Sequence, residues 1–176
     1  LEETLAGART VDVLEGVGDH ENIGAIFRNA AGMGVDAVIF GNGCADPLYR
    51  RSVRVSMGHV LRTSFVHLGG THTTWQRRLE ELRAAGFRLV SLTPDPGAVV
   101  LPEALADAAG DAYERVALLV GAEGPGLTEH AMRATDVRAR LPMAPGTDSL
   151  NVATSAAVAF YERDRSPGLP GVRRSW

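Results

Sequence analysis

The sequence of 176 residues contains no lysine and only one cysteine, Cys44. A single cysteine excludes an intramolecular disulfide framework and is typical of a reducing compartment, so we expect a cytoplasmic protein. The chain also lacks an apolar run of about 18 residues and opens on no signal-peptide pattern, which argues against a membrane span. Because lysine is absent, all eighteen basic residues are arginine, a bias for which genomic base composition is explanation enough.

Motifs of several enzyme classes are missing as well. The loop GVGDHEN after the first apolar run lacks the G-x-G-x-x-G of a dinucleotide site, and the glycine turn at Gly121 lacks the Lys-Ser/Thr of a P-loop. The five histidines show no zinc-ligand spacing, so we expect no metal. Ser149 is not in a G-x-S-x-G elbow, and Cys44 has no evident partner for nucleophilic catalysis. These absences argue against nucleotide hydrolysis, zinc chemistry and hydrolase activity.

The charge of the chain gives a mixed indication about nucleic acids. The net charge of −3 and the pI near 6.0 argue weakly against a general polyanion binder, which usually has a basic face. Four arginines nevertheless crowd one short segment, namely Arg50, Arg51, Arg54 and Arg62. This segment is the candidate for phosphate contacts, which we expect to be weak and salt-sensitive in the isolated chain.

The apolar residues favour one α/β domain. At 45% hydrophobic residues, a chain of this length can bury a core of its own. Short apolar runs alternate with helix-like patterns, which predicts a mostly parallel sheet with helices on both faces. The expected strands are 11–14, 37–40, 64–68, 87–92, 116–120 and 137–141, and the expected helices lie near 22–30, 49–61, 75–85, 127–134 and 150–162. The alanine-rich stretch before Tyr113 has no clear pattern.

Two loops follow directly on predicted strands. The sequence LLVGAEGPG (118–126) runs from a strand into a turn with three glycines, and LPMAPGTDSLNV (141–152) runs from the next strand toward the last helix. Glycine has no Cβ, so such a turn lets a ligand approach main-chain groups directly. In open α/β sheets, ligands bind outside the carboxyl ends of the strands. The two loops therefore predict one shared binding crevice.

Single polar residues near these loops do not by themselves indicate function. Asn22 and Ser149, or Asp148 in its place, are good helix N-caps. Arg28 lies off the apolar stripe of its helix and is compatible with a solvated side chain, and Glu123 with an ordinary turn acid. Their joint occurrence with the glycine turn is what suggests a common site.

Three motifs occur along the chain in a defined order: ENIGAIFRNAAGMG (21–34), LLVGAEGPGL (118–127) and LPMAPGTDSLNVATSAAVAFYE (141–162). Together they resemble the SpoU-type (TrmH-like) RNA ribose 2′-O-methyltransferases of the SPOUT class. The resemblance implies S-adenosylmethionine as methyl donor, RNA as substrate, a homodimer, and a C-terminal trefoil knot through which the last helix passes. Periodicity and spacing give no indication of a knot, and the rarity of knots would argue against one.

Carried over residue by residue, the resemblance assigns roles to several positions. The catalytic set is Asn22, Arg28, Glu123, Ser149 and Asn151. The cofactor contacts are Gly121, Leu141 and Leu150, with backbone help from Thr93, Gly124 and Met143. Methylating a ribose hydroxyl requires positioning and proton removal but no metal. In the family's dimer, Arg28 is expected near the partner's cofactor, where it would hold a phosphate beside the ribose and assist proton removal.

The resemblance also implies a domain organisation, with residues 1–164 as the catalytic domain and 165–176 as a flexible tail. Many relatives carry an RNA-binding domain upstream; its absence from this sequence, which starts at Leu1 rather than Met, leaves the choice between tRNA and rRNA open. One alternative is a module that binds RNA but has lost turnover, against which the complete catalytic set argues. The other is a knotted methyltransferase acting on a base atom, against which the Ser-Leu-Asn of the third motif argues.

Overall fold

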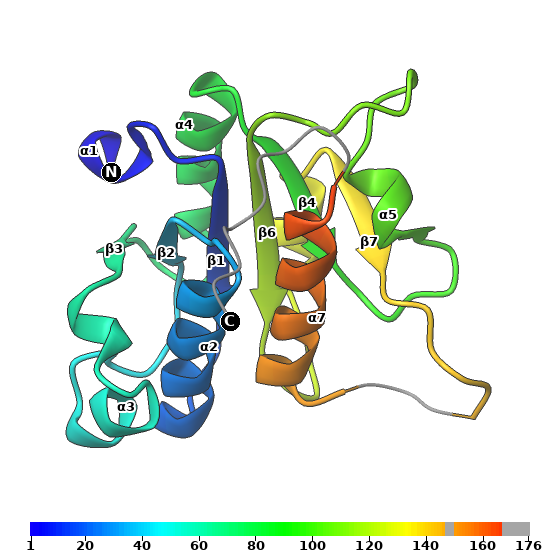
Figure 1. Cartoon of the computed structure of the whole chain (residues 1–176). Coiled ribbons are helices and arrows are strands. Elements are labelled where there is room, and N and C mark those ends of the chain that lie inside the picture. The colour runs from blue at the N-terminus through cyan, green and yellow to red at the C-terminus, as the bar shows by residue number, and fades with distance from the viewer. Residues whose placement is uncertain (147–149, 167–176) are drawn as a thin grey trace.

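The computed structural model describes residues 1–146 and 150–166 of the protein. In this part of the chain a seven-stranded sheet has the order β3-β2-β1-β6-β4-β7-β5, and every neighbouring pair is parallel (Figure 1). The strands are β1 (Thr10–Glu15), β2 (Ala37–Phe40), β3 (Ser64–His67), β4 (Arg88–Leu92), β5 (Val99–Val100), β6 (Val116–Gly121) and β7 (Val137–Arg140). Because the strands run the same way, their carboxyl ends meet at one edge of the sheet, the lower edge in Figure 1.

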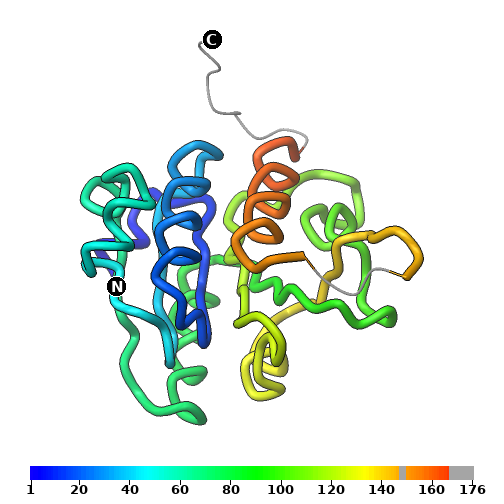
Figure 2. Tube along the Cα trace, turned by 90° about the horizontal axis from the view of Figure 1, so that it is seen from below, coloured from blue at the N-terminus to red at the C-terminus, as the bar shows by residue number. Residues whose placement is uncertain are grey.

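Helices cover both faces of the sheet (Figures 1 and 2). The layer on one face consists of α2 (His20–Gly32), α5 (Leu101–Ala104) and α7 (Val152–Asp164), with α3 (Arg50–Val55) and the 3-10 turn η1 (His59–Leu61) packed against α2. The layer on the other face consists of α1 (Glu2–Leu5), the 3-10 turn η2 (Trp75–Arg78), α4 (Leu79–Ala84) and α6 (Glu129–Arg133). The predicted α/β fold, with a parallel sheet covered by helices on both faces, is confirmed.

The buried residues of β1 show how the sheet divides the core. Val11 and Val13 belong to the apolar cluster beneath α1, α4 and α6, whereas Leu14 belongs to the cluster beneath α2, α5 and α7. Side chains alternate between the two faces along a strand, so both clusters draw on the same strand. The same alternation places Asp12 on the side of Leu14, where it is fully buried.

Two predicted helices are interrupted in the structure. The expected helix 49–61 ends at Val55 and resumes as η1, because Met57 and Gly58 take left-handed φ values of 56° and 78°. The expected helix 75–85 begins as the tighter turn η2 and only then becomes α4. The unpatterned stretch before Tyr113 contains β5 and α5, both too short to produce a periodic signal.

The N-caps of the two long helices differ from those expected. Asp19, and not Asn22, caps α2, accepting a hydrogen bond from the backbone N–H of Glu21 at 2.8 Å. Asn151 caps α7, accepting from the N–H groups of the two residues that follow Val152 in the chain. Several neighbouring residues in each loop could act as the cap, so side-chain type alone could not select one. The residues 147–149, which include the other expected caps of the last helix, lie outside the described part of the chain.

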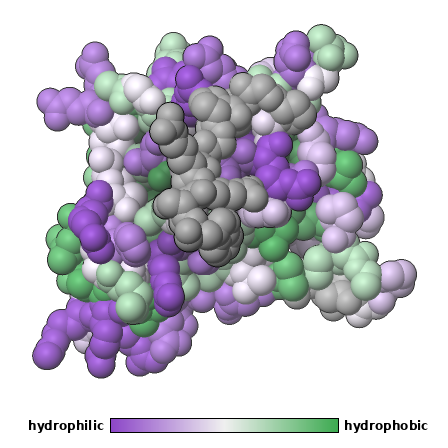
Figure 3. All heavy atoms as spheres, viewed as in Figure 1, coloured by the Kyte–Doolittle hydropathy of each residue, from purple (hydrophilic) through white to green (hydrophobic). Residues whose placement is uncertain are grey.

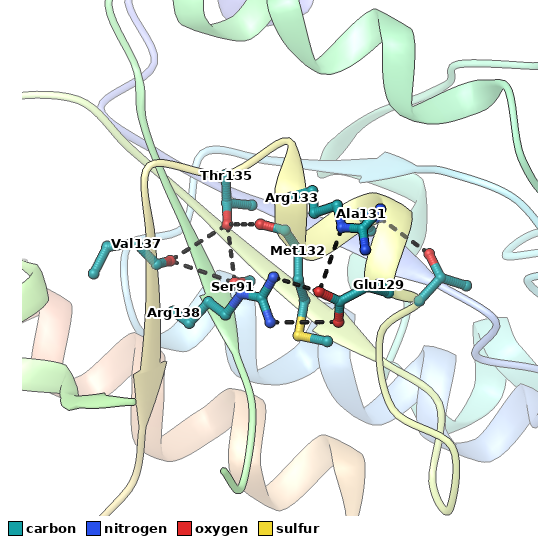
Figure 4. Close-up of polar contacts among 9 residues, drawn as sticks. Ser91, Glu129, Ala131, Met132, Arg133, Thr135, Val137 and Arg138 are labelled. Carbon is teal, nitrogen blue, oxygen red and sulfur yellow. Dashed lines mark hydrogen bonds and ion pairs between the residues drawn. The ribbon is translucent and has the colours of Figure 1, made fainter. Parts of the chain in front are cut away.

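The turn between α6 and β7 is held by polar contacts (Figure 4). The hydroxyl of Thr135 donates to the carbonyl of Met132 at 2.6 Å and lies 3.0 Å from the hydroxyl of Ser91 in β4. The carboxylate of Glu129 pairs with the guanidinium of Arg138 in β7 at 2.7 Å. These contacts join β7 to β4 and to α6, so the position from which the second loop departs is well defined.

The last turn of α7 is anchored by Arg163, whose exposed fraction is 1%. Its guanidinium donates to the hydroxyl of Thr10 at 3.0 Å and to the carbonyl oxygens of Tyr113 and Glu114 at 2.6 and 3.0 Å. Burial lowers the pKa of Arg163 to about 10, so the group stays charged at neutral pH. The bonds tie the end of α7 to the segments that enter β1 and β6, and so define the axis of the helix that Asn151 caps.

The buried carboxyl group of Asp12 has no stabilising partner among the described residues. Neither side-chain oxygen of Asp12 has a hydrogen-bond partner within residues 1–146 and 150–166. Burial in the apolar cluster raises the pKa of Asp12 well above its usual range, because desolvation disfavours the charged form. Asp12 therefore costs the folded protein stability whenever the pH is high enough to ionise the same group in the unfolded chain.

We expect Asp12→Asn to remove a loss of stability that the wild-type protein suffers as pH rises. Between the unfolded pKa, about 3.9, and the raised folded pKa, the folded state binds the extra proton, so the free energy of unfolding falls with increasing pH. Asparagine cannot ionise and has nearly the same shape. Urea unfolding from about pH 4 to about pH 8 measures the effect, and the variant's advantage should grow with pH. Parallel pH profiles for the two proteins would show that Asp12 does not titrate in this way.

Candidate functional site

A cavity of about 270 Å³ opens at the carboxyl edge of the sheet. Its walls come from the segments that follow β4, β6 and β7 and from the first turn of α7. Six residues predicted as cofactor contacts line it together: Thr93, Gly121, Gly124, Leu141, Met143 and Leu150. They come from segments far apart in the sequence, and they meet here because parallel strands bring their carboxyl ends to one edge.

The glycine turn after β6 folds tightly back on itself. The N–H of Gly126 donates to the carbonyl of Ala122 at 2.9 Å, and Gly124 and Gly126 take left-handed φ values of 82° and 68°. A Cβ added to Gly121 would lie 2.3 Å from the backbone of Gly126 and Leu127. Glycine at 121 is therefore required by the turn itself, and a substitution such as Gly121→Val would disturb the turn in addition to any bound ligand.

Three predicted catalytic residues form one hydrogen-bonded chain at the wall of the cavity. The amide nitrogen of Asn151 donates to Oε1 of Glu123 at 2.5 Å and to Oδ1 of Asn22 at 3.2 Å. The N–H of Val152, at the start of α7, also donates to Oε1 of Glu123, at 3.3 Å. Glu123 itself lines the cavity, so the chain reaches from the cavity to the first turn of α2.

The side chain of Asn151 is held at both ends. Its Oδ1 accepts from the backbone N–H groups of Ala153 and Thr154, at 2.9 and 3.3 Å, while its Nδ2 makes the two bonds to Glu123 and Asn22. Exchanging the oxygen and the nitrogen would face donors with donors and acceptors with acceptors, so the network defines the orientation of the amide. One residue thus serves both as helix cap and as the holder of the polar chain.

The other two predicted catalytic residues are not part of this arrangement. Arg28 follows Asn22 by six residues, about 240° around the helix axis, so it points away from the polar chain. It is exposed, does not line the cavity, and makes no hydrogen bond or ion pair with the described residues. Asn29 instead faces α7, donating to the carbonyl of Ala153 at 3.4 Å. Ser149 lies outside the described residues.

Other residues of the cavity went unnoticed at the level of sequence. Arg140 and Ser155 line it, and the Nε of Arg140 donates to the carbonyl of Ala98 at 3.2 Å. Both could have been found from their positions, because Arg140 is at the carboxyl end of a predicted strand and Ser155 lies one helical turn after Asn151. Their side chains add a positive charge and a hydroxyl to walls that are otherwise largely apolar or backbone.

A buried carboxylate, that of Glu15, fixes the position of Thr128, the residue that follows the glycine turn. It accepts hydrogen bonds from the indole N–H of Trp75 at 2.7 Å and from the backbone N–H and hydroxyl of Thr128 at 2.6 and 3.0 Å. Thr128 directly follows the turn and caps α6, so these bonds hold the far side of the turn in place. No sequence signal distinguished Glu15, since it occupies the last position of an ordinary strand pattern.

Cys44, the one cysteine of the sequence, is not among the residues that line the cavity. Burial raises the pKa of the Cys44 thiol to about 11, so this cysteine is a poor nucleophile at neutral pH. Within the described ranges, no three His, Cys, Asp or Glu side chains come close enough together to hold a metal ion. The helices of the same ranges include none that is long and apolar enough to cross a membrane.

Comparisons with known proteins identify the relatives of the chain. Residues 10–161 match the model of the SpoU rRNA Methylase family. An uncharacterised tRNA/rRNA methyltransferase of Mycobacterium tuberculosis is 62% identical over 93% of this chain and 54% of its own length. The 23S rRNA (guanosine(2553)-2′-O)-methyltransferase of Bacillus subtilis is 32% identical over 91% of this chain and 60% of its own length.

A solved structure agrees with these matches. The AdoMet-bound rRNA methyltransferase from Sinorhizobium meliloti superposes with a TM-score of 0.77 and 29% identity, covering 89% of this chain and 56% of that one. The chain thus spans between 54% and 60% of the length of the three relatives described. The residues that match the family model include both loops of the cavity and all three residues of the hydrogen-bonded chain. The protein therefore belongs to the SpoU rRNA Methylase family.

Proposed function

We propose that residues 1–164 form the catalytic domain of an enzyme that transfers a methyl group from S-adenosylmethionine to a ribose 2′-hydroxyl of tRNA or rRNA. The observation that carries the proposal is the meeting of six expected cofactor residues in one cavity, with Glu123 at its wall and Asn151 hydrogen-bonded to Glu123. The relatives support it, since one is named a guanosine 2′-O-methyltransferase and another was solved with bound AdoMet. Residues 165–176 are proposed as a tail outside this domain; of these, 167–176 are not described.

The cavity suits a molecule with an apolar ring system and a polar tail. Its volume lies near the lower end for small-molecule sites, about 300 Å³. Leu141, Met143 and Leu150 offer apolar surface for the faces of an adenine, while the open backbone at Gly124 offers hydrogen bonds to its edge. When bound, S-adenosylmethionine supplies an electrophilic methyl group on a sulfonium. The proposal requires no metal.

The protein's own residues then have to place the hydroxyl and remove its proton. Glu123 is held by Asn151 and by the amino end of α7, so the position of its carboxylate is defined before any ligand binds. Arg28, exposed and unpaired with any described residue, is free to bind a phosphate beside the target ribose and to assist proton removal. Because it faces away from its own cavity, it would act at the cavity of a second subunit.

A homodimer is therefore part of the proposal. The face of α7 that points away from the sheet carries Thr154, Val158 and Tyr161, spaced as one helical stripe, and the two apolar side chains are each 43% exposed. Such a face gains stability by packing against another copy. Light scattering at micromolar concentration should return twice the 18.7 kDa of one chain, and a monomeric mass would contradict this part of the proposal.

The trefoil knot and the cellular location are likewise proposals. In support of a knot, β7 lies near one end of the sheet, whereas α7 packs against β6 and α2, on the other side of β4. Such a placement brings the last helix close to segments that precede it in the chain. A cytoplasmic location is supported by the single cysteine, Cys44, which is free and half-buried.

Two measurements test the proposed function. Calorimetry should detect S-adenosylmethionine binding in the presence of a metal chelator. Met143→Trp, which fills the cavity, should weaken it by at least about 10-fold, whereas Ala144→Trp, on an exposed neighbour outside the cavity, should not. Incubation of the protein with cofactor and total RNA, followed by nucleoside mass spectrometry, should yield ribose-methylated nucleosides. Methyl groups on a base ring, or equal cofactor binding by both variants, would overturn the proposal.

A further inference from the structure

The segment around α3 exposes an unusual combination of apolar and basic side chains. Among the described residues, seven large hydrophobic side chains are exposed, and four of them lie here: Leu48, Tyr49, Met57 and Leu61, at 55%, 55%, 63% and 66%. The same segment carries exposed arginines that form no ion pair with the described residues, namely Arg50, Arg54 and Arg62. We call Tyr49, Arg50, Arg54, Met57, Leu61 and Arg62 the α3 surface. Figure 3 shows hydrophobic and hydrophilic side chains side by side in this region, at the lower left.

One arginine of this segment is already engaged in an ion pair within the described part of the protein. Arg51 forms an ion pair with Glu21 in the first turn of α2, and this contact raises the pKa of Arg51 further above its usual value. Its charge is already neutralised locally, so we exclude it from the surface. Arg50 and Arg54 are four residues apart on α3 and hence lie on the same side of the helix.

The α3 surface is presented on a rigid support. The hydroxyl of Ser52 donates to the carbonyl of Asp46 at 3.1 Å, and the hydroxyl of Ser56 donates to that of Val53 at 2.7 Å; both serines are fully buried. A Cβ on Gly24 of α2 would lie 2.6 Å from the carbonyl oxygen of Ser52, so α3 rests directly on the backbone of α2. The backbone that carries the exposed side chains is therefore held in place before any partner binds.

The surface lies on the same edge of the sheet as the cavity (Figure 1). The ring of Tyr49 is 4.3 Å from the ring of His20, the first residue of α2. Two residues further on, Asn22 begins the hydrogen-bonded chain that runs through Asn151 to Glu123 at the cavity wall. A ligand covering the α3 surface would thus continue toward the polar chain.

We propose that the α3 surface binds a single-stranded stretch of the substrate RNA, with a base stacked on Tyr49 and phosphates at Arg50, Arg54 and Arg62. The proposal rests on the proposed function. Bases stack on exposed aromatic rings irrespective of sequence, and guanidinium groups bind phosphates in two places at once. Unpaired positive charge in a chain of net charge −3 favours a polyanion. A second copy fits less well, since facing surfaces would bring like charges together.

The test uses a fluorescein-labelled single-stranded RNA of about 12 nucleotides and fluorescence anisotropy over a range of salt concentrations. Tyr49→Ala should weaken binding by about 5- to 150-fold, the loss expected for one base stack, and Tyr49→Phe should restore it. The double variant Arg50→Ala/Arg54→Ala should reduce the slope of log affinity against log salt by about 1.4, the value for two phosphates on a single strand.

Matched controls come from the other face of the sheet. Arg77→Ala/Arg133→Ala removes two exposed arginines from η2 and α6, and its affinity and salt slope should equal those of the wild-type protein. Wild-type binding by the Arg50/Arg54 and Tyr49→Ala variants, or an equal loss in the control, would overturn the proposal. So would tighter binding of duplex RNA, or a change of molecular mass in the variants, which would make the surface a contact between copies.

The outcome is separable from that of the proposed function. If the wild-type protein binds S-adenosylmethionine and methylates RNA while the α3 variants bind and methylate RNA as well as the wild type, only the assignment of the α3 surface fails. If RNA binding depends on Tyr49 and Arg50 as expected but no ribose is methylated, the surface stands and the proposed reaction fails.

Discussion

Arg28→Ala should lower the single-turnover rate of RNA methylation by about 10²- to 10⁴-fold, the range for losing a positioned proton-transfer group. Its side chain is exposed, makes no hydrogen bond or ion pair with the described residues and does not line the cavity, so folding and cofactor affinity should stay at wild-type levels. Arg28→Lys should recover little, because an ammonium cannot bind phosphate in the two-pronged manner of a guanidinium. Arg133→Ala, another exposed arginine, is the control and should retain the wild-type rate.

The same variant tests whether the site is shared between subunits. If Arg28 acts at the partner's cavity, mixing Arg28→Ala with Glu123→Gln allows the two variants to exchange subunits. Each mixed dimer then contains one site with an intact Glu123 from one variant and an intact Arg28 from the other. Equal mixing should then recover about a quarter of the wild-type rate, since half of the dimers carry one working site. If the methylation rate of the mixture is only the sum of the rates of the two variants alone, Arg28 and Glu123 act in the site of the same subunit. A wild-type rate in Arg28→Ala alone would make the residue an ordinary solvated side chain.

Asn151→Ala should lower both stability and rate, because this residue caps α7 and also holds Glu123 and Asn22. Loss of the cap should cost about 1 kcal/mol of unfolding free energy. Release of the carboxylate of Glu123 should lower the rate by about 10²-fold, the size of effect seen when catalytic groups are slightly misplaced. Chemical denaturation and single-turnover methylation, at saturating cofactor and RNA, measure the two effects separately.

Asn151→Asp separates capping from positioning. Aspartate caps a helix as well as asparagine does, so most of the stability should be retained. It replaces the N–H donor with an oxygen facing Oε1 of Glu123, where Asn151 now donates at 2.5 Å, and the two carboxylates repel each other. The repulsion offsets part of the stability that the cap retains, so we expect a smaller loss of stability than in Asn151→Ala, with a rate as low as in that variant. A wild-type rate in the aspartate variant would mean that Asn151 serves only as a helix cap.

The sequence by itself determined the class of the fold and the location of the cavity. Alternating apolar runs and helical stripes suffice to predict a parallel sheet covered on both faces, because each element has to bury one side. Parallel strands end at a common edge, so the residues following 116–120 and 137–141 could be placed together without a structure. Motif resemblance named the individual positions. That Thr93, Met143 and Leu150 line one cavity agrees with this prediction, while their roles as cofactor contacts stay predictions.

Only the tertiary structure decided which polar residues meet. Asp19, rather than Asn22, caps α2, and Asn151 caps α7, because several nearby side chains could cap each helix and the surrounding contacts select among them. Asn22 is thereby free to accept from Asn151, 129 positions away in the chain, and no local pattern encodes such a pairing. Arg28 is separated from the hydrogen bonds of Asn22, Asn151 and Glu123 because of its angular position on α2 once α7 has packed against the same helix. Packing between distant segments therefore decides which residues cap the helices and which polar side chains meet, and sequence periodicity carries no information about such packing.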